Sequence, residues 1–281
     1  SVHNVYKLMV DPDSCFDRRV SSDVALPQEK AFAKILRNSS LPIESVVFHH
    51  LAHSGGSALR RVLQHICEKR NLMCLETKNQ CLPSNPAQHH IDILFGHFNF
   101  RPERLVHLMR GRPLIFTLLR DPYEVCRSGY FFHKTKSDVS SSMANAFDRT
   151  ARAIAGDRPN RARLVDSGCT RMLNHLHLYD LVAPYNQSNE LLVELHKKMP
   201  ATWKVELQEL CTEKVNVITN QIGMRDKLAR FDAALSPAAH ARWSSNFLCH
   251  QMAYDQAVEN WTMMSTRSPV AEVESFKRLC R

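Results

Sequence analysis

The chain has 281 residues, of which 44% are hydrophobic and 23% charged, and its net charge at neutral pH is +9. This length supports one large core, and the positive charge favours anionic ligands such as a nucleotide, an acidic glycan or nucleic acid. No run of 18 apolar residues occurs, which excludes a membrane span within these residues. Membrane contact is therefore expected only through a span outside them.

The predicted elements begin with an irregular stretch at 1–27 and a helix at 28–38, so that 1–40 form an N-terminal segment. The core is expected at 41–261 and a tail at 262–281. The three parts make up a single domain. The chain contains no internal repeat and no low-complexity segment.

The core opens with an apolar strand at 45–50 and a turn of small residues, followed by a helix at 57–70. Leu59, Val62, Leu63 and Ile66 share one face of this helix. Small residues let backbone N–H groups approach an anion closely, and the helix dipole favours negative charge there. The turn is therefore a candidate phosphate site. An ordinary strand-to-helix turn is the alternative, and the chain lacks the Gly-Lys pair of a nucleotide triphosphatase loop.

A second strand at 72–76 and a loop at 77–90 lead to a third strand at 91–95, which ends in a turn at Gly96-His97. A short helix is predicted at 101–109. His97 is a candidate general base, because the pKa of imidazole lies near 6.5 and therefore close to working pH. A histidine that caps a strand is the alternative.

The next strand, 113–119, ends in a second polar turn, where Arg120 comes just before the helix N-cap Asp121. The following helix is expected at 122–134, and Ser128 lies two turns into it. Ligands of open parallel sheets bind at such strand ends. Two anion-seeking turns in one chain indicate a ligand with two separated anionic groups. Alternatively, Arg120 pairs with a nearby carboxylate.

The remaining sequence is mostly helical, after a polar linker at 135–142 and with a basic loop at 156–163. A further strand is predicted at 215–219. The alternation of strands and helices predicts an α/β fold, in which a central parallel sheet has helices on both faces.

Two motifs resemble those of the carbohydrate sulfotransferases that use 3′-phosphoadenosine-5′-phosphosulfate (PAPS), in particular the heparan sulfate 6-O and 2-O groups and related bacterial enzymes. Residues 50–59 (HLAHSGGSAL) resemble the phosphosulfate loop H-x-x-K-T-G-G/S-T/S. Residues 119–122 (LRDP), with Ser128 and Tyr130 in register, resemble the 3′-phosphate motif, although Val125 replaces a common second arginine. The Gly96-His97 pair, the segment 167–173 and the helix at 247–257 match further family segments more weakly.

The resemblance implies a P-loop-like three-layer fold, PAPS as cosubstrate, no metal ion, and His97 as the catalytic base. Arg120 and Ser128 would hold the 3′-phosphate, with Thr170 and Arg171 as further cofactor-binding residues. The phosphosulfate would be wrapped by residues 53–58, namely His53, Ser54, Gly55, Gly56, Ser57 and Ala58.

His53 departs from the family, which has a lysine at this position to stabilise the leaving oxygen. A histidine can do so only when it is protonated or as a neutral N–H donor. His53 is thus a second catalytic candidate, and a lapsed sulfotransferase-like nucleotide- or glycan-binding protein is the alternative function. A basic glycan- or nucleic-acid-binding domain is a third class, although no nucleic-acid-binding module is recognisable. The expected acceptor is an anionic glycan or a small molecule, with no nucleic-acid partner.

Three glycosylation sequons, at Asn38, Asn186 and Asn260, and nine cysteines suggest a glycoprotein with disulfides in the secretory pathway. Cys74 and Cys81 flank a loop and are a candidate pair; reduced core cysteines are the alternative. The resemblance implies the Golgi lumen, with the cytoplasm as the alternative location.

Overall fold

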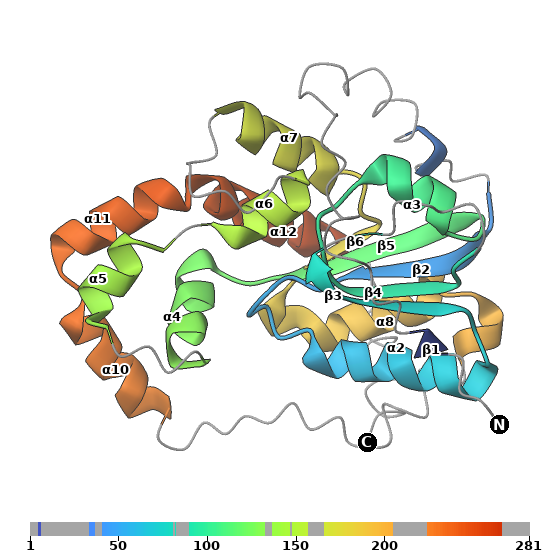
Figure 1. Ribbon diagram of the computed structural model, residues 1–281, viewed down its shortest axis with the longest axis horizontal. Coiled ribbons are helices and arrows are strands. Elements are labelled where there is room, and N and C mark those ends of the chain that lie inside the picture. The colour runs from blue at the N-terminus through green and yellow to red at the C-terminus, as the bar shows by residue number, and fades with distance from the viewer. Residues whose placement is uncertain are drawn as a thin grey trace.

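A parallel β-sheet runs through the middle of the computed structural model (Figure 1). The structure describes residues 5–6, 34–36, 41–80, 82, 90–132, 137–146, 148–156, 166–204 and 224–265. The strand order is β1-β3-β4-β2-β5-β6, and every neighbouring pair is parallel. The strands are β1 (Val5–Tyr6), β2 (Ile43–His49), β3 (Cys74–Gln80), β4 (Ile93–Phe98), β5 (Arg112–Leu119) and β6 (Leu181–Pro184). The predicted α/β fold is confirmed, and β2 lies between β4 and β5.

Helices cover both faces of the sheet, and their apolar side chains form two cores (Figure 1). One face packs against α2 (Ser57–Arg70) and α8 (Ser188–Lys198), and the short helix η3 (Ala201–Trp203) adds Trp203. The other face packs against α3 (Pro102–Leu108), α6 (Arg149–Ala155), α7 (Asp166–Leu176) and α12 (Leu248–Ser265). Side chains alternate between the two cores along β2, as Val46 and Phe48 face one and Val47 the other. The result is a three-layer arrangement.

A third apolar cluster lies beyond the carboxyl end of β5, on the left of Figure 1. It is built from α4 (Pro122–Phe132), α5 (Val139–Ala144), α10 (Met224–Ala234) and α11 (Pro237–Asn246). Met143, Phe231, Trp243 and Phe247 are its buried members. This cluster places α4 next to the edge of the sheet where β2 and β5 end.

Most predicted elements match the structure, and the strand ends differ where neighbouring strands extend the pairing. The strand predicted at 91–95 runs instead from Ile93 to Phe98, so Gly96 and His97 lie within β4 and not in a turn. Gly96 pairs with His49 on one side and with Thr77 on the other, which continues the ladder. For the same reason β3 extends to Gln80, into the predicted loop. Helix α5 begins inside the linker predicted at 135–142.

Two predicted elements lie wholly or largely outside the described residues. The strand at 215–219 is one of them. Of the helix at 28–38, residues 34–36 are described and are helical.

The disulfide prediction is correct in kind and wrong in pairing. Cys74 is bonded to Cys67, seven residues earlier, and not to Cys81, which lies outside the described residues. Helix α2 ends at Arg70 and the chain turns at once into β3, so Cys67 in the last turn of the helix faces the first residue of the strand. A second disulfide joins Cys169 of α7 to Cys249 of α12. Disulfides persist in oxidising compartments. In the described part of the chain, every helix is too short or too polar to cross a bilayer.

Candidate functional site

The turn between β2 and α2 has the features of an anion site. Helix α2 starts after Gly56, which forms no side-chain cap, so the N–H groups of its first turn lack that partner. The hydroxyl of Ser54 is buried and has no hydrogen-bond partner. Backbone N–H groups and a buried hydroxyl at the start of a 14-residue helix form an arrangement that favours a bound phosphate or sulfate.

Glycine is required at position 55. Gly55 has a φ of +77°, and a Cβ there would overlap the ring of Tyr185. Tyr185 begins the short helix η2 (Tyr185–Gln187) directly after β6. The ring of Tyr185 therefore covers the turn and brings β6 into the site.

We predict that Gly55→Ala destabilises the protein, because the side chain must displace Tyr185 at a position where φ is strained. The expected loss is about 1–3 kcal/mol of unfolding free energy. Thermal and urea unfolding measure it. Gly129→Ala is the matched control: Gly129 lies within α4, its nearest neighbour would be His53 Nε2 at 3.4 Å, and alanine favours a helix. Equal stability of Gly55→Ala and wild type would contradict the prediction.

Arg120 lies over the same turn. Its Nη1 donates to the carbonyl of His53 at 3.3 Å, and its guanidinium lies 4.9 Å from the centre of the Tyr185 ring. Its Nη2 also pairs with Glu124 at 3.2 Å, which confirms the alternative that Arg120 has a carboxylate partner. Glu124 is shared, however, because Arg127 contacts its other oxygen at 2.8 Å. The Arg120 side chain is 23% exposed and so remains accessible to a ligand.

The other three residues predicted to bind the nucleotide lie on two different helices, Ser128 on α4 and Thr170 and Arg171 on α7. Ser128 is half-buried on α4, one turn beyond Glu124 and so on the same helix face as the partner of Arg120. Thr170 is exposed and Arg171 half-buried on α7, which packs against α6 and α12. The assignment of these two residues rests on the resemblance alone.

His97 is held by the backbone of the neighbouring strand. Its Nδ1 lies 2.6 Å from the carbonyl oxygen of His50, and its ring stacks on the His50 ring with centroids 4.3 Å apart. Because a carbonyl only accepts, Nδ1 carries the proton, and the lone pair of the neutral ring is on Nε2. Burial lowers the pKa of His97, and the charge of Arg60 lowers it further. His97 is therefore neutral at pH 7 with Nε2 as the basic nitrogen, which is the state that a general base requires.

Three residues of the site were not singled out from the sequence: His50, Arg60 and Tyr185. Arg60 lies in the first turn of α2 and pairs with Glu76 of β3 at 3.5 Å. His50 is buried, and burial lowers its pKa to about 3. Tyr185 follows a strand of only four residues, too short to stand out as a pattern. The position of Arg60 off the apolar stripe of α2 was the one available signal.

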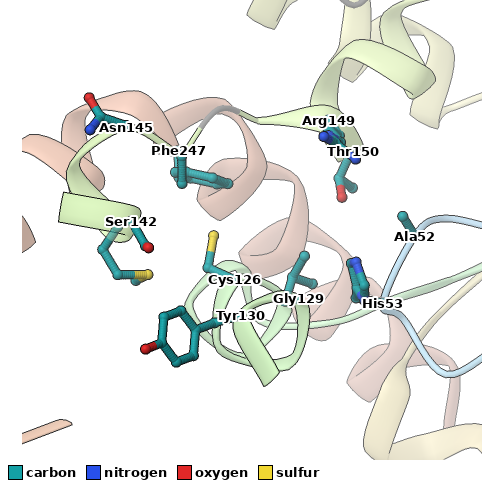
Figure 2. A pocket seen from close by; sticks show the side chains of 13 residues that line it. Ala52, His53, Cys126, Gly129, Tyr130, Ser142, Asn145, Arg149, Thr150 and Phe247 are labelled. Atoms are coloured by element: carbon teal, nitrogen blue, oxygen red, sulfur yellow. The ribbon is translucent and has the colours of Figure 1, made fainter. Parts of the chain in front are cut away.

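A cavity of about 290 Å³ lies beside His53, between the turn that follows β2 and the helices α4, α5 and α6 (Figure 2). Figure 2 shows His53 beside Gly129 on one wall, with Ser142 and Asn145 on the opposite side. The lining mixes apolar and polar side chains. It comprises Ala52, His53, Val125, Cys126, Gly129, Tyr130, Ser142, Met143, Asn145, Ala146, Arg149, Thr150 and Phe247. His53 is the one predicted site residue on this wall; His97, Arg120 and Ser128 do not line it.

Comparison with protein-family models gives no match, and comparison with curated proteins finds no similar sequence. Within the described residues, no three His, Cys, Asp or Glu side chains converge in a way that could hold a metal ion.

Proposed function

We propose that the protein is a sulfotransferase, which moves the sulfuryl group of PAPS to an acceptor hydroxyl or amine. The observation that carries this proposal is the state and place of His97. This histidine is neutral, its Nε2 is the basic nitrogen, and it lies in β4 beside β2. Two anion-seeking groups follow the ends of the adjacent strands: the start of α2 after β2, and Arg120 after β5. Sulfuryl transfer needs these three parts: a base, a cradle for the phosphosulfate and a cation for the 3′-phosphate.

In the proposed reaction, the acceptor oxygen or nitrogen attacks sulfur while the bond from sulfur to the phosphate oxygen breaks. Nε2 of His97 takes the acceptor proton. The bonding electron pair stays on the phosphate oxygen of the leaving 3′-phosphoadenosine-5′-phosphate. The N–H groups of residues 55–58 stabilise the charge that grows on that oxygen, since the N–H of Ser54 donates to the carbonyl of Leu51. Arg120, and Ser128 on the same helix face as Glu124, bind the distant 3′-phosphate.

The acceptor class follows from charge and compartment. A net charge of +9 and two disulfides support an anionic glycan or small-molecule acceptor and a location in the secretory pathway, with the Golgi lumen as the proposed compartment. The test is a screen of glycan and small-molecule acceptors with labelled PAPS. If no acceptor takes up the label but the nucleotide product still binds, the proposed enzymatic activity is contradicted. The protein is then a nucleotide-binding protein.

That second function, a lapsed sulfotransferase-like binding protein, is favoured by one observation. His53 stands where the family has lysine, and its ring lies edge-on to Phe132 of α4 at 5.6 Å. An imidazole in this position supplies less positive charge to the leaving oxygen than an ammonium group does.

We predict that His53→Lys keeps turnover at pH 6 and raises it at pH 8, because a lysine stays protonated where a histidine loses its charge. His53→Ala should lose more turnover than nucleotide affinity, since the interaction grows in the transition state. Rate profiles from pH 5.5 to 9 with one acceptor measure both effects. Turnover of His53→Ala equal to that of wild type would remove His53 from the reaction and leave the N–H groups of 55–58 to stabilise the leaving group. Activity gained only in His53→Lys would identify a lapsed enzyme.

A further inference from the structure

A buried acid and a buried histidine lie behind Arg120. His250 of α12 is fully buried, and its Nε2 lies 3.0 Å from the carbonyl oxygen of Arg120. Its Nδ1 lies 3.7 Å from Oδ1 of Asp148, the N-cap residue of α6, and has no hydrogen-bond partner. Oδ2 of Asp148 is also buried and without a partner. An imidazole is thus placed between two acceptors, a carboxyl group and a main-chain carbonyl.

A neutral imidazole cannot donate to both of its neighbours. The ring has one N–H, and an acceptor lies on each side of it. The Arg120 carbonyl takes that proton from Nε2, which leaves the Nδ1 lone pair facing Asp148. One further proton, on Asp148 or on Nδ1, removes this repulsion, because either the acid becomes neutral or the ring becomes a cation beside the carboxylate 3.7 Å away. Without it, the carboxylate draws the proton of the ring to Nδ1, and the carbonyl of Arg120 loses its donor.

The surroundings determine the pH at which this proton is held. Burial raises the pKa of Asp148 from its ordinary 3.8 to about 7, against the lowering effect of the backbone N–H groups of Ala151, His250 and Thr150 and the charge of Arg152. Burial also lowers the pKa of His250 to about 4. The Cys126 thiol of α4 stays neutral, because burial raises its pKa to about 12 and the charge of Asp148 acts in the same direction.

The shared proton acts on the candidate site through the position of Arg120. The main chain of Arg120 directly follows β5 and its carbonyl is the acceptor for His250, while its guanidinium contacts the turn at His53 and the Tyr185 ring. A shift of the Arg120 main chain therefore moves the cation that the proposed function assigns to the 3′-phosphate.

We propose that Asp148 and His250 are positioning residues that share one proton and, while they hold it, fix Arg120 for binding an adenosine 3′,5′-bisphosphate. The proposal rests on the proposed function for its ligand. Because the acid has a raised pKa in the folded protein, the stabilisation is complete in acid, below its ordinary value, and is lost as the pH rises through about 7. Nucleotide affinity should therefore decline from pH 6 to pH 8.5.

Asp148→Asn separates this role from a merely structural one. The amide oxygen can accept from the Ala151 N–H, as Oδ1 of Asp148 does at 2.8 Å, and the amide carries no charge at any pH, so that no carboxylate forms opposite Nδ1 of His250. His250→Phe keeps a ring but removes the donor to Arg120. His175→Phe is the matched control, because His175 is also a buried histidine beside a main-chain carbonyl, that of Ile154, on another helix.

The experiment measures two quantities for these four proteins between pH 6 and 8.5: the calorimetric affinity for 3′-phosphoadenosine-5′-phosphate, and the amide-exchange protection of residues 119–125 without nucleotide. In the wild type, affinity should fall about threefold to tenfold and protection should fall with it. Asp148→Asn should flatten both profiles, His250→Phe should be low throughout, and His175→Phe should follow the wild type.

Identical pH profiles of protection in the wild type and Asp148→Asn would overturn the proposal. Since protection is measured without nucleotide, it decides the proposal even if the wild type binds no nucleotide; that result would contradict the proposed function alone. If His250→Phe does not fold, the comparison of the wild type with Asp148→Asn still decides.

Discussion

His97→Ala is expected to lower turnover by about 10²–10⁴-fold while changing nucleotide affinity less than threefold. The imidazole is held by the His50 carbonyl at 2.6 Å with Nε2 as its basic nitrogen, and it lies outside the contacts that join Arg120 to the turn. Its removal leaves the acceptor proton without a base but leaves the anion-binding groups in place. Single-turnover rates and calorimetry on the same preparations separate the two effects.

The pH profile adds a second test of His97. Because burial lowers its pKa, the acid limb of the turnover profile should lie below the ordinary histidine value of 6.5. His107→Ala is the control, since His107 is an exposed histidine in the last turn of α3. Turnover of His97→Ala equal to that of His107→Ala would remove His97 from the mechanism, and failure of His97→Ala to fold would show a structural role.

Arg120→Ala is expected to weaken binding of 3′-phosphoadenosine-5′-phosphate by about 10–100-fold. A hydrogen bond to a charged group contributes roughly 1.5–3 kcal/mol, which corresponds to one to two decades in the dissociation constant. Arg120→Lys should recover part of the loss, because an ammonium group keeps the charge but lacks the planar fork. Calorimetry at fixed ionic strength measures all three proteins.

Arg127 offers a matched control for Arg120. Both guanidiniums contact Glu124, but Arg127 also binds Asp232 of α10 at 3.1 Å, in the helical cluster beyond the sheet. Arg127→Ala should therefore lower stability and leave nucleotide affinity nearly unchanged. Equal losses of affinity in Arg127→Ala and Arg120→Ala would show that the net positive charge around Glu124, and not the position of Arg120, determines binding.

The sequence alone was sufficient for the local parts of the site. The helix predicted at 57–70 begins and ends as predicted, because its apolar residues repeat at helical spacing and the glycines before it favour a turn. The capping role of Asp121 is also local, and its Oδ1 accepts from the Glu124 N–H at 3.0 Å. Each of these features depends on residues within a few positions of one another.

Strand ends and disulfide pairing could not be predicted in this way. Whether β4 stops at Phe95 or continues through His97 depends on the strands beside it, which supply its hydrogen bonds. Cys74 had several cysteines within reach along the chain, and the direction in which α2 returns to the sheet selected Cys67. The local sequence pattern shows neither the strands that pair with β4 nor the cysteine that lies beside Cys74.

The chemical state of the site was decided by tertiary structure. The tautomer of His97 is set by the carbonyl of His50, 47 positions away, because β2 and β4 are adjacent in the sheet. Tyr185 covers Gly55 because β6 is next to β5. His250 reaches the carbonyl of Arg120 across 130 positions. The sequence determined which residues were present to bind an anion and move a proton; the order of the strands brought them together, because parallel strands place residues that are distant in the chain at one edge of the sheet.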